Sequence, residues 1–170
     1  MIKPNYKFVK DMARKVLKDH KITSIPTDLK KIFDKLGLQF IELDNPSDID
    51  GAIIEIDGKP RIAVLNKAKS ISRQRFTLAH ELGHIFLSHN KRDFYEVVEN
   101  ESEVPDSPSE KAKPSKEIEA DVFASELLIP YQQLKKHHDR VNDLENISRL
   151  FQVSKDTMSI AIANYWRYAK

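Results

Sequence analysis

The stretch Phe76-Thr77-Leu78-Ala79-His80-Glu81-Leu82-Gly83-His84-Ile85-Phe86 contains the pattern H-E-x-x-H within an apolar run that favours an α-helix. On a helix, His80 and His84 lie one turn apart and project from the same face. Two imidazoles in this arrangement can bind one zinc ion at roughly 2.0–2.1 Å. Glu81 lies beside that face, where it can accept a proton from a water whose pKa the metal lowers to about 7. The pattern therefore predicts a hydrolytic zinc site.

The residues around the motif favour a largely buried helix. They are Leu78, Ala79, Leu82, Ile85, Phe86 and Leu87. A His-Glu pair on a solvated helix face is common and carries no chemistry, but two histidines and a glutamate on a buried helix need a partner. Gly83 costs about 1 kcal/mol relative to alanine in a helix interior. We therefore expect a strand or a substrate to lie close to the backbone at Gly83.

Catalytic zinc usually takes three protein ligands, so a further His, Asp or Glu is required. The segment from Ser115 to Pro130 is typical of a helix, with Ser115 as a possible N-cap and Pro130 just past its end. One stripe of this helix is formed by Glu117, Ala120, Asp121, Ala124 and Leu128. Its small residues would allow the helix to lie close to the H-E-x-x-H helix.

Two glutamates of this helix compete for the role of third ligand. Glu117 lies on the stripe and can reach the metal, while Asp121 can hold a ligand histidine through its second ring nitrogen. Glu119 points about 160° away from Glu117 around the helix axis. Glu119 is the weaker candidate, and its exchange for Gln should do little, but it remains an alternative because sequence does not fix the rotation of a helix.

Two motifs together resemble the ImmA/IrrE family of zinc-peptidase-like regulators. The first is the run from Arg75 to Ile85, and the second is Glu117-x-x-Ala120-Asp121-x-Phe123-Ala124-x-x-Leu127-Leu128-x-Pro130. The resemblance also takes in the strand-like segment Arg61–Asn66 and covers roughly residues 50–135.

The resemblance implies a zincin-like α+β fold in which a small sheet packs on helices. It also implies that His80, His84 and Glu117 are the zinc ligands, as in a gluzincin, and that Glu81 is the catalytic acid/base. Family members include short metalloproteases of phages and mobile elements that cleave a helix-turn-helix repressor, and longer stress regulators with an added sensory domain. This chain is similar to the short form.

Composition agrees with a compact intracellular protein. The chain has 170 residues, which suits one domain, and its 40% apolar content can supply a core. The absence of cysteine means that zinc must be held by histidine and carboxylate, which favours a catalytic site over a structural one. The N-terminus lacks an apolar signal core and no apolar run approaches the ~20 residues of a membrane span. We expect a cytoplasmic location.

The expected order of elements follows from periodicity and turn signals. It is N-terminal helices over 1–37, a small sheet over 38–66, the active-site helix over 70–90, a polar loop over 92–115, the third-ligand helix over 116–129 and C-terminal helices over 131–170. Strands are expected over 38–43, 51–56 and 61–65, the last two joined by a hairpin turn at 57–60. By resemblance, 61–65 would be an edge strand beside the substrate, although an ordinary structural strand is equally compatible with its sequence.

Several segments have weaker patterns. The loop over 92–115 is rich in Glu, Ser, Lys and Pro and is expected to be mobile, with a lid over the site as the alternative. The helix over 7–21 should bury Phe8, Met12, Val16 and Leu17. His137 and His138 are expected to be solvated, and Tyr131 is an oxyanion donor only by weak analogy.

The segment over 144–158 has the spacing of a helix-turn-helix, with Ser154 as N-cap of its second helix. That helix begins Lys155-Asp156-Thr157-Met158 and then becomes apolar, which does not suit base contacts. The net charge of +2 implies no strong attraction to nucleic acid either. We expect packing against the core and no DNA binding.

Two functions follow from these patterns. The favoured one is a zinc endopeptidase that inactivates a repressor protein by cleavage. The alternative is a non-proteolytic zinc-containing regulator that binds a protein or DNA. The presence of Glu81 favours the enzyme, since a scaffold has no need of a catalytic base.

Overall fold

The computed structural model describes residues 4–44, 50–56, 59–89 and 114–168. Its helices are α1 (Tyr6–Asp19), α2 (Leu29–Leu36), α3 (Ile71–Phe86), α5 (Ser115–Leu128), α6 (Tyr131–Lys136), η2 (His138–Arg140, a 3-10 turn), α7 (Leu144–Phe151) and α8 (Lys155–Tyr168). Its strands are β1 (Gln39–Leu43), β2 (Gly51–Ile56) and β3 (Lys59–Asn66). The predicted α+β class with a small sheet is confirmed.

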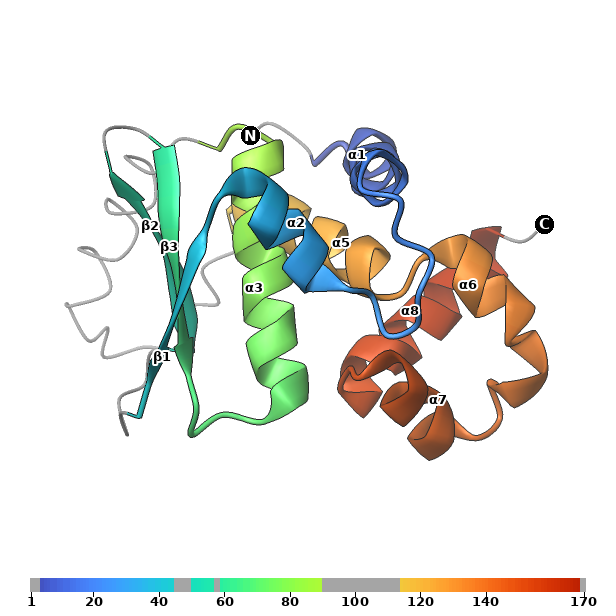
Figure 1. The fold of residues 1–170 in the computed structure, drawn as a ribbon. Helices are drawn as coiled ribbons and strands as arrows, with labels where there is room; N and C mark the ends of the chain where they lie inside the picture. Colours follow the sequence, from blue (N-terminus) through green and yellow to red (C-terminus); the bar gives the residue numbers. More distant parts are fainter. Residues whose placement is uncertain (1–3, 45–49, 57–58, 90–113, 169–170) are drawn as a thin grey trace, which may run out of the picture.

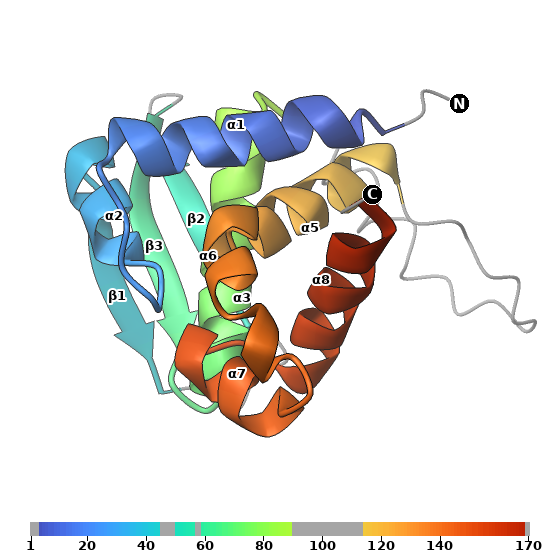
Figure 2. The same cartoon turned by 90° about the vertical axis from the view of Figure 1, so that its right-hand side faces the viewer.

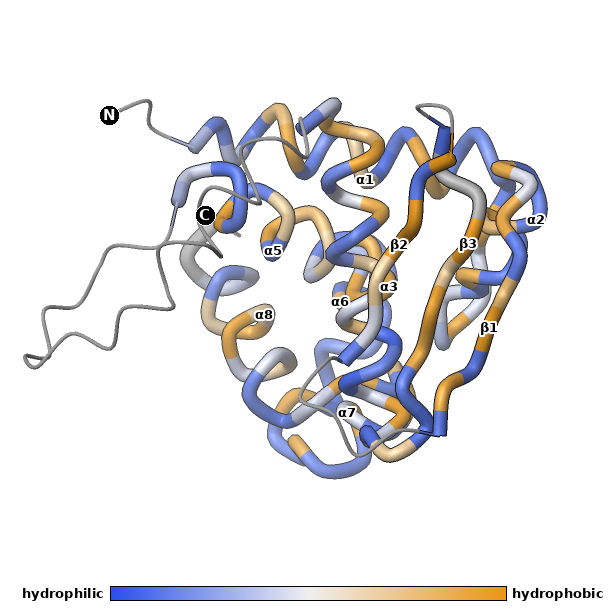
Figure 3. Tube along the Cα trace, turned by 90° about the vertical axis from the view of Figure 1, so that its left-hand side faces the viewer, coloured by the Kyte–Doolittle hydropathy of each residue, from blue (hydrophilic) through white to orange (hydrophobic). Residues whose placement is uncertain are grey.

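Helix α3 lies at the centre of the molecule. The sheet covers one of its sides and α5 lies on the other (Figure 1). Helix α1 runs across α5, while α6, α7 and α8 lie together below α5 in the view of Figure 2. The strands are mainly hydrophobic and the helices carry polar and apolar stripes (Figure 3). The H-E-x-x-H helix is therefore enclosed on two sides, which explains its apolar flanks.

The sheet has the strand order β1-β3-β2. Strands β2 and β3 are antiparallel, as the hairpin signal predicted, although residues 57–58 of the turn lie outside the described residues. The prediction that 61–65 forms the edge of the sheet is wrong, because β1 pairs in parallel with the other side of β3. Any strand that adds to this sheet must pair with β1 or β2.

Helices α3 and α5 make their closest approach at Gly83. A Cβ atom at Gly83 would lie 3.1 Å from Cα and 3.2 Å from the carbonyl oxygen of Ala120, and 3.3 Å from Cβ of Phe123. The neighbour at Gly83 is thus a helix, and the expectation of a strand or a substrate is wrong. Ala120 and Ala124 are fully buried, so the small residues of α5 do bring the two backbones together, as their spacing suggested.

Helix ends depart from the sequence-based limits by a few residues. Asp28 caps α2, where its side chain accepts a hydrogen bond from the amide of Lys31. Helix α5 begins at Ser115, which is its first residue and not its N-cap. Helix α3 ends at Phe86, earlier than the expected residue 90, because Ser88 adopts a left-handed conformation with φ of +57°.

Helix α1 buries Val16 and Leu17 as expected, but not Phe8. Phe8 is 51% exposed, whereas Val9 is fully buried. The buried residues of the helix are Val9, Ala13, Val16 and Leu17. Met12 packs against the core from a half-buried position. The apolar stripe therefore starts one residue later than the sequence suggested.

The C-terminal helices pack on the core, as predicted. Ile147 and Phe151 of α7 and Met158 of α8 are fully buried. Ser154 caps α8, because its Oγ accepts a hydrogen bond from the amide of Thr157 at 3.1 Å. His138 is exposed, but the prediction that His137 is solvated is wrong in part.

His137 is half-buried, and its ring meets the ring of Phe151 edge-on at a centroid distance of 6.1 Å.

The expected polar loop over 92–115 lies almost wholly outside the described residues. Among the helices that the structure describes, none combines the length and the apolar character that crossing a membrane requires.

The contact at Gly83 gives a test of the fold. Exchange of Gly83 for Val should lower the free energy of unfolding by about 1–3 kcal/mol, because the added methyl groups meet the backbone of α5 and force the helices apart. Chemical denaturation measures this change. Ser159→Val, on the exposed side of α8, is the control and should change stability far less. Equal stability of both variants would contradict the close packing of α3 on α5.

Candidate metal site

Helix α3 presents its two motif histidines to one point. Ser70 caps the helix by accepting a hydrogen bond from the amide of Arg73 at 3.3 Å. The helix then continues without a break through His80 and His84, whose ring centroids lie 4.8 Å apart. The two Nε2 atoms face each other at 3.0 Å. The one-turn spacing thus converts directly into two convergent nitrogen atoms.

The third group comes from the first turn of α5. Glu117 places Oε2 at 3.2 Å from Nε2 of His80 and Oε1 at 3.2 Å from Nε2 of His84. Glu119 does not join this cluster and instead lies against His89. The rotation of α5 is therefore the one that the stripe of small residues indicated.

The geometry of the cluster fits a tetrahedral metal ion. His80, His84 and Glu117 offer ligand atoms that all lie within 4.8 Å of one another. A zinc ion with bonds of about 2.0–2.1 Å separates its tetrahedral ligands by roughly 3.3 Å. The two Nε2 atoms are 3.0 Å apart, and each lies 3.2 Å from a different oxygen of Glu117. Two imidazoles and one carboxylate leave a fourth position for water or substrate, which is the donor set of catalytic zinc sites.

The carboxylate of Asp121 contacts the ring nitrogen of His80 that does not face the cluster. Oδ1 of Asp121 lies 2.9 Å from Nδ1 of His80, so that nitrogen donates its hydrogen to Asp121 and Nε2 faces the cluster. Asp121 thus takes the position that the sequence suggested for it. Burial alone would lower the pKa of His80, but the hydrogen bonds with Asp121 and Glu117 raise it to about 9.

Glu117 is held in its charged form. Burial acts to raise the pKa of this carboxyl group, but the hydrogen bonds with His80 and His84 hold the pKa well below its usual value. An ionised carboxylate between two imidazoles is the state that binds a divalent cation without first losing a proton. Glu81 follows His80 on α3 and is half-buried.

Sequence patterns did not indicate a role for His89. Its side chain is only 7% exposed, and its Nδ1 lies 3.1 Å from Nδ1 of His84. On the other side, its Nε2 lies 3.2 Å from Oε2 of Glu119. The only sequence signal is a third histidine five residues after His84.

Tyr131 lies away from the cluster. It begins α6 at the opposite end of α5 from Glu117, and its ring stacks on that of Tyr165 at a centroid distance of 5.1 Å. The guanidinium of Arg14 lies 5.9 Å from the same ring. These contacts give Tyr131 a structural place, and the weak analogy with an oxyanion donor is not supported.

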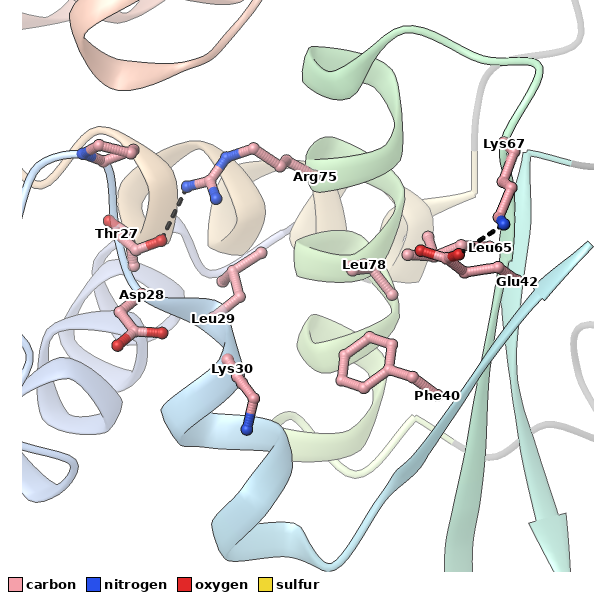
Figure 4. A pocket seen from close by; sticks show the side chains of 11 residues that line it. Thr27, Asp28, Leu29, Lys30, Phe40, Glu42, Leu65, Lys67, Arg75 and Leu78 are labelled. Carbon is pink, nitrogen blue, oxygen red and sulfur yellow. Dashed lines mark hydrogen bonds and ion pairs between the residues drawn. The ribbon is translucent and has the colours of Figure 1, made fainter.

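A cavity of about 780 Å³ lies on the opposite side of α3 (Figure 4). Arg75 and Leu78 line it, and both point away from the His80 side of the helix by roughly 140–160°. Nη2 of Arg75 donates to the carbonyl of Thr27 at 2.8 Å, which ties α3 to the segment before α2. The cavity is therefore separate from the metal site, and its lining residue Arg75 helps to hold α3 in place.

The cluster predicts the metal content of variants. The purified protein should hold one zinc ion per chain, and His80→Ala should hold almost none, because one of three ligands is lost. Glu117→Gln should lose much of the metal, whereas Glu81→Gln should retain it. Elemental analysis of the dialysed proteins measures this. Equal and negligible zinc in the wild type and His80→Ala would contradict the site.

The raised pKa of His80 predicts that zinc binding releases a proton. Because this pKa is about 9, the Nε2 atom carries a proton at pH 7.5 that the metal must displace. At least one proton should be released per zinc ion, with a further contribution from the metal-bound water, and affinity should fall as the pH decreases below 9. Calorimetry in buffers with different ionisation enthalpies measures the release. Binding without proton release would show that His80 is neutral in the metal-free protein.

Comparisons with known proteins bear on the fold and the family of this chain. A search of curated proteins finds no match. Among solved structures, the chain is similar to a Mycobacterium tuberculosis transcriptional regulator, with a TM-score of 0.62 and 16% sequence identity over 89% of this chain and 45% of that chain. The chain thus spans less than half the length of that regulator, and the likeness shows the fold alone.

The sequence matches a family over most of its length. Residues 33–162 match Peptidase_M78, described as the IrrE N-terminal-like domain. This range includes the sheet, α3 and α5, and with them His80, His84 and Glu117. The resemblance seen in the two motifs is therefore confirmed, and the chain belongs to the IrrE N-terminal-like (Peptidase_M78) family.

Proposed function

We propose that this protein is a zinc-dependent endopeptidase that acts in the cytoplasm and inactivates a helix-turn-helix repressor by cleaving it. The observation that carries the proposal is the convergence of His80, His84 and Glu117, whose ligand atoms all lie within 4.8 Å of one another. Membership of a peptidase family supports the reaction class. A similar solved structure is that of a transcriptional regulator, which supports a role in transcription.

The chemistry follows from the residues around the cluster. His80, His84 and Glu117 would hold a zinc ion, which would supply Lewis-acid chemistry by lowering the pKa of a bound water to about 7. Glu81 accepts the proton of the attacking water and passes it to the amine that leaves. Asp121 keeps the Nδ1 hydrogen of His80 in place, so that Nε2 faces the cluster throughout.

The rival function is regulation by binding alone. For DNA binding, the first turn of α8 would have to offer basic or amide side chains to the major groove. Lys155 in that turn instead forms an ion pair with Glu145 of α7, and the acidic Asp156 follows it. These residues disfavour a DNA-binding role for α8 and leave protein binding as the alternative to cleavage.

Co-expression with its repressor tests the proposal. The repressor should be encoded next to this protein, because a small enzyme with little surface for substrate selection is expected to act on one cognate target. Wild-type protein should shorten the repressor, and Glu81→Gln should leave it intact while retaining zinc. Immunoblotting of the repressor measures cleavage. Loss of DNA occupancy without cleavage, equal for both proteins, would favour regulation by binding.

A further inference from the structure

A chain of polar contacts leads away from the second motif histidine. His84 uses Nε2 in the cluster, and its Nδ1 lies 3.1 Å from Nδ1 of His89. Nε2 of His89 lies 3.2 Å from Oε2 of Glu119, and Oε1 of Glu119 accepts a hydrogen bond from the backbone amide of Asn5 at 2.9 Å. The contacts join α3, α5 and the N-terminus of α1.

When a metal ion takes the place of the hydrogen that links Nε2 of His84 to Glu117, only one arrangement of hydrogens satisfies these contacts with neutral rings. An ionised Glu119 can only accept, so Nε2 of His89 carries the hydrogen and donates it. The Nδ1 atom of His89 then has a lone pair and accepts the Nδ1 hydrogen of His84. His84 is left with its lone pair on Nε2, which is the atom that faces Glu117 and His80. The contacts therefore select the tautomer of His84 that can bind a metal.

The backbone after α3 places His89 in this position. The amide of Ser88 donates to the carbonyl of Ile85 at 3.2 Å, and the amide of His89 donates to the carbonyl of His84 at 2.9 Å. These two bonds, with the left-handed Ser88, form a Schellman motif, which folds the chain back over the last turn of a helix. As a result, the rings of His84 and His89 lie with centroids 5.1 Å apart.

Glu119 is fixed independently of His89. Its side chain is 20% exposed, and its second oxygen is held by the amide of Asn5, the N-cap residue of α1. The carboxylate therefore cannot rotate away from His89 without breaking its hydrogen bond with the amide of Asn5. His80 receives the same kind of support from one carboxylate directly, whereas His84 receives it through a second imidazole.

We propose that His89 and Glu119 are positioning residues of the metal site, which fix the orientation and tautomer of His84. The inference rests on the proposed function only in that the cluster binds a divalent metal, and it does not require proteolysis. It revises the sequence-based expectation that the exchange of Glu119 does little. Neither residue contacts the cluster atoms themselves, so both act through His84.

Cobalt binding tests the proposal, because Co²⁺ reports both affinity and ligand geometry through its visible absorption. His89→Leu should weaken Co²⁺ binding about 10- to 100-fold, as is typical for the loss of a residue that supports a metal ligand. His89→Gln should recover most of the affinity, because its amide oxygen accepts from His84 and its amide nitrogen donates to Glu119. Competition with a chelator measures the affinity, and the absorption band should shift in His89→Leu.

Two glutamates of α5 give a matched pair of variants. Glu119→Ala should weaken Co²⁺ binding at least several-fold. Glu126→Ala should leave it unchanged, although Glu126 also ties α5 to α1 through a 2.9 Å ion pair with Arg14. Thermal unfolding of the metal-free proteins shows whether each variant is folded. Comparison of these two variants distinguishes an effect of Glu119 on the metal site from a general weakening of the contact between α1 and α5.

Each result decides the inference. Weak binding by His89→Leu and Glu119→Ala, with recovery in His89→Gln and normal binding by Glu126→Ala, supports it. Equal affinity in all variants would overturn it while leaving the metal site intact. Equal weakening in His89→Gln and Glu126→Ala would show that packing alone is responsible, and would also overturn it. Failure of the wild type to bind Co²⁺ would instead overturn the proposed function, and this inference with it.

Discussion

The close approach of α3 and α5 is the constraint on which the site depends. Three ligand atoms from two helices can lie about 3 Å apart only if the backbones nearly touch, and they do so where Gly83 meets Ala120. The ligands are placed around this point. On α3, His80 and His84 lie three residues before and one residue after Gly83, and Glu117 holds the corresponding place three residues before Ala120. The glycine thus lowers the intrinsic stability of the helix but allows the spacing of the proposed metal ligands. The sheet packs on the other side of α3 and holds this helix against α5.

Local patterns predicted the parts of the protein whose chemistry is local. The spacing of His80 and His84 gives their common face from helix geometry alone, and the small residues around Ala120 indicated which side of α5 faces α3, and so favoured Glu117. The strand order was not accessible in this way. Segment 61–65 has the composition of a strand, but its central place depends on β1, which pairs with it from a distant part of the sequence. The same limit applies to α1, where the phase of the buried stripe is decided by packing on α5.

The end of α3 shows a different limit of sequence patterns. A Schellman motif usually has glycine in the left-handed position, and this glycine marks the helix end in a sequence. Here Ser88 takes that position with φ of +57°, so the sequence carries no stop signal and the helix was expected to continue to residue 90. In a continued helix, His89 would lie about 140° around the axis from His84. The unusual turn brings the two rings together instead.

Helix α1 links the site to a part of the chain that precedes the family match, which begins at residue 33. Its attachment to α5 comes mainly from burial, since each buried valine or leucine contributes roughly 1.5–3 kcal/mol. The ion pair of Arg14 with Glu126 adds little, about 0–1 kcal/mol, because Arg14 is 45% exposed. Burial alone does not fix a helix along its axis, whereas a directional hydrogen bond does. The bond from Asn5 to Glu119 supplies that direction, and Glu119 faces the histidine behind His84. The chain of contacts that ends at His84, a proposed metal ligand, therefore reaches beyond the residues that match the family.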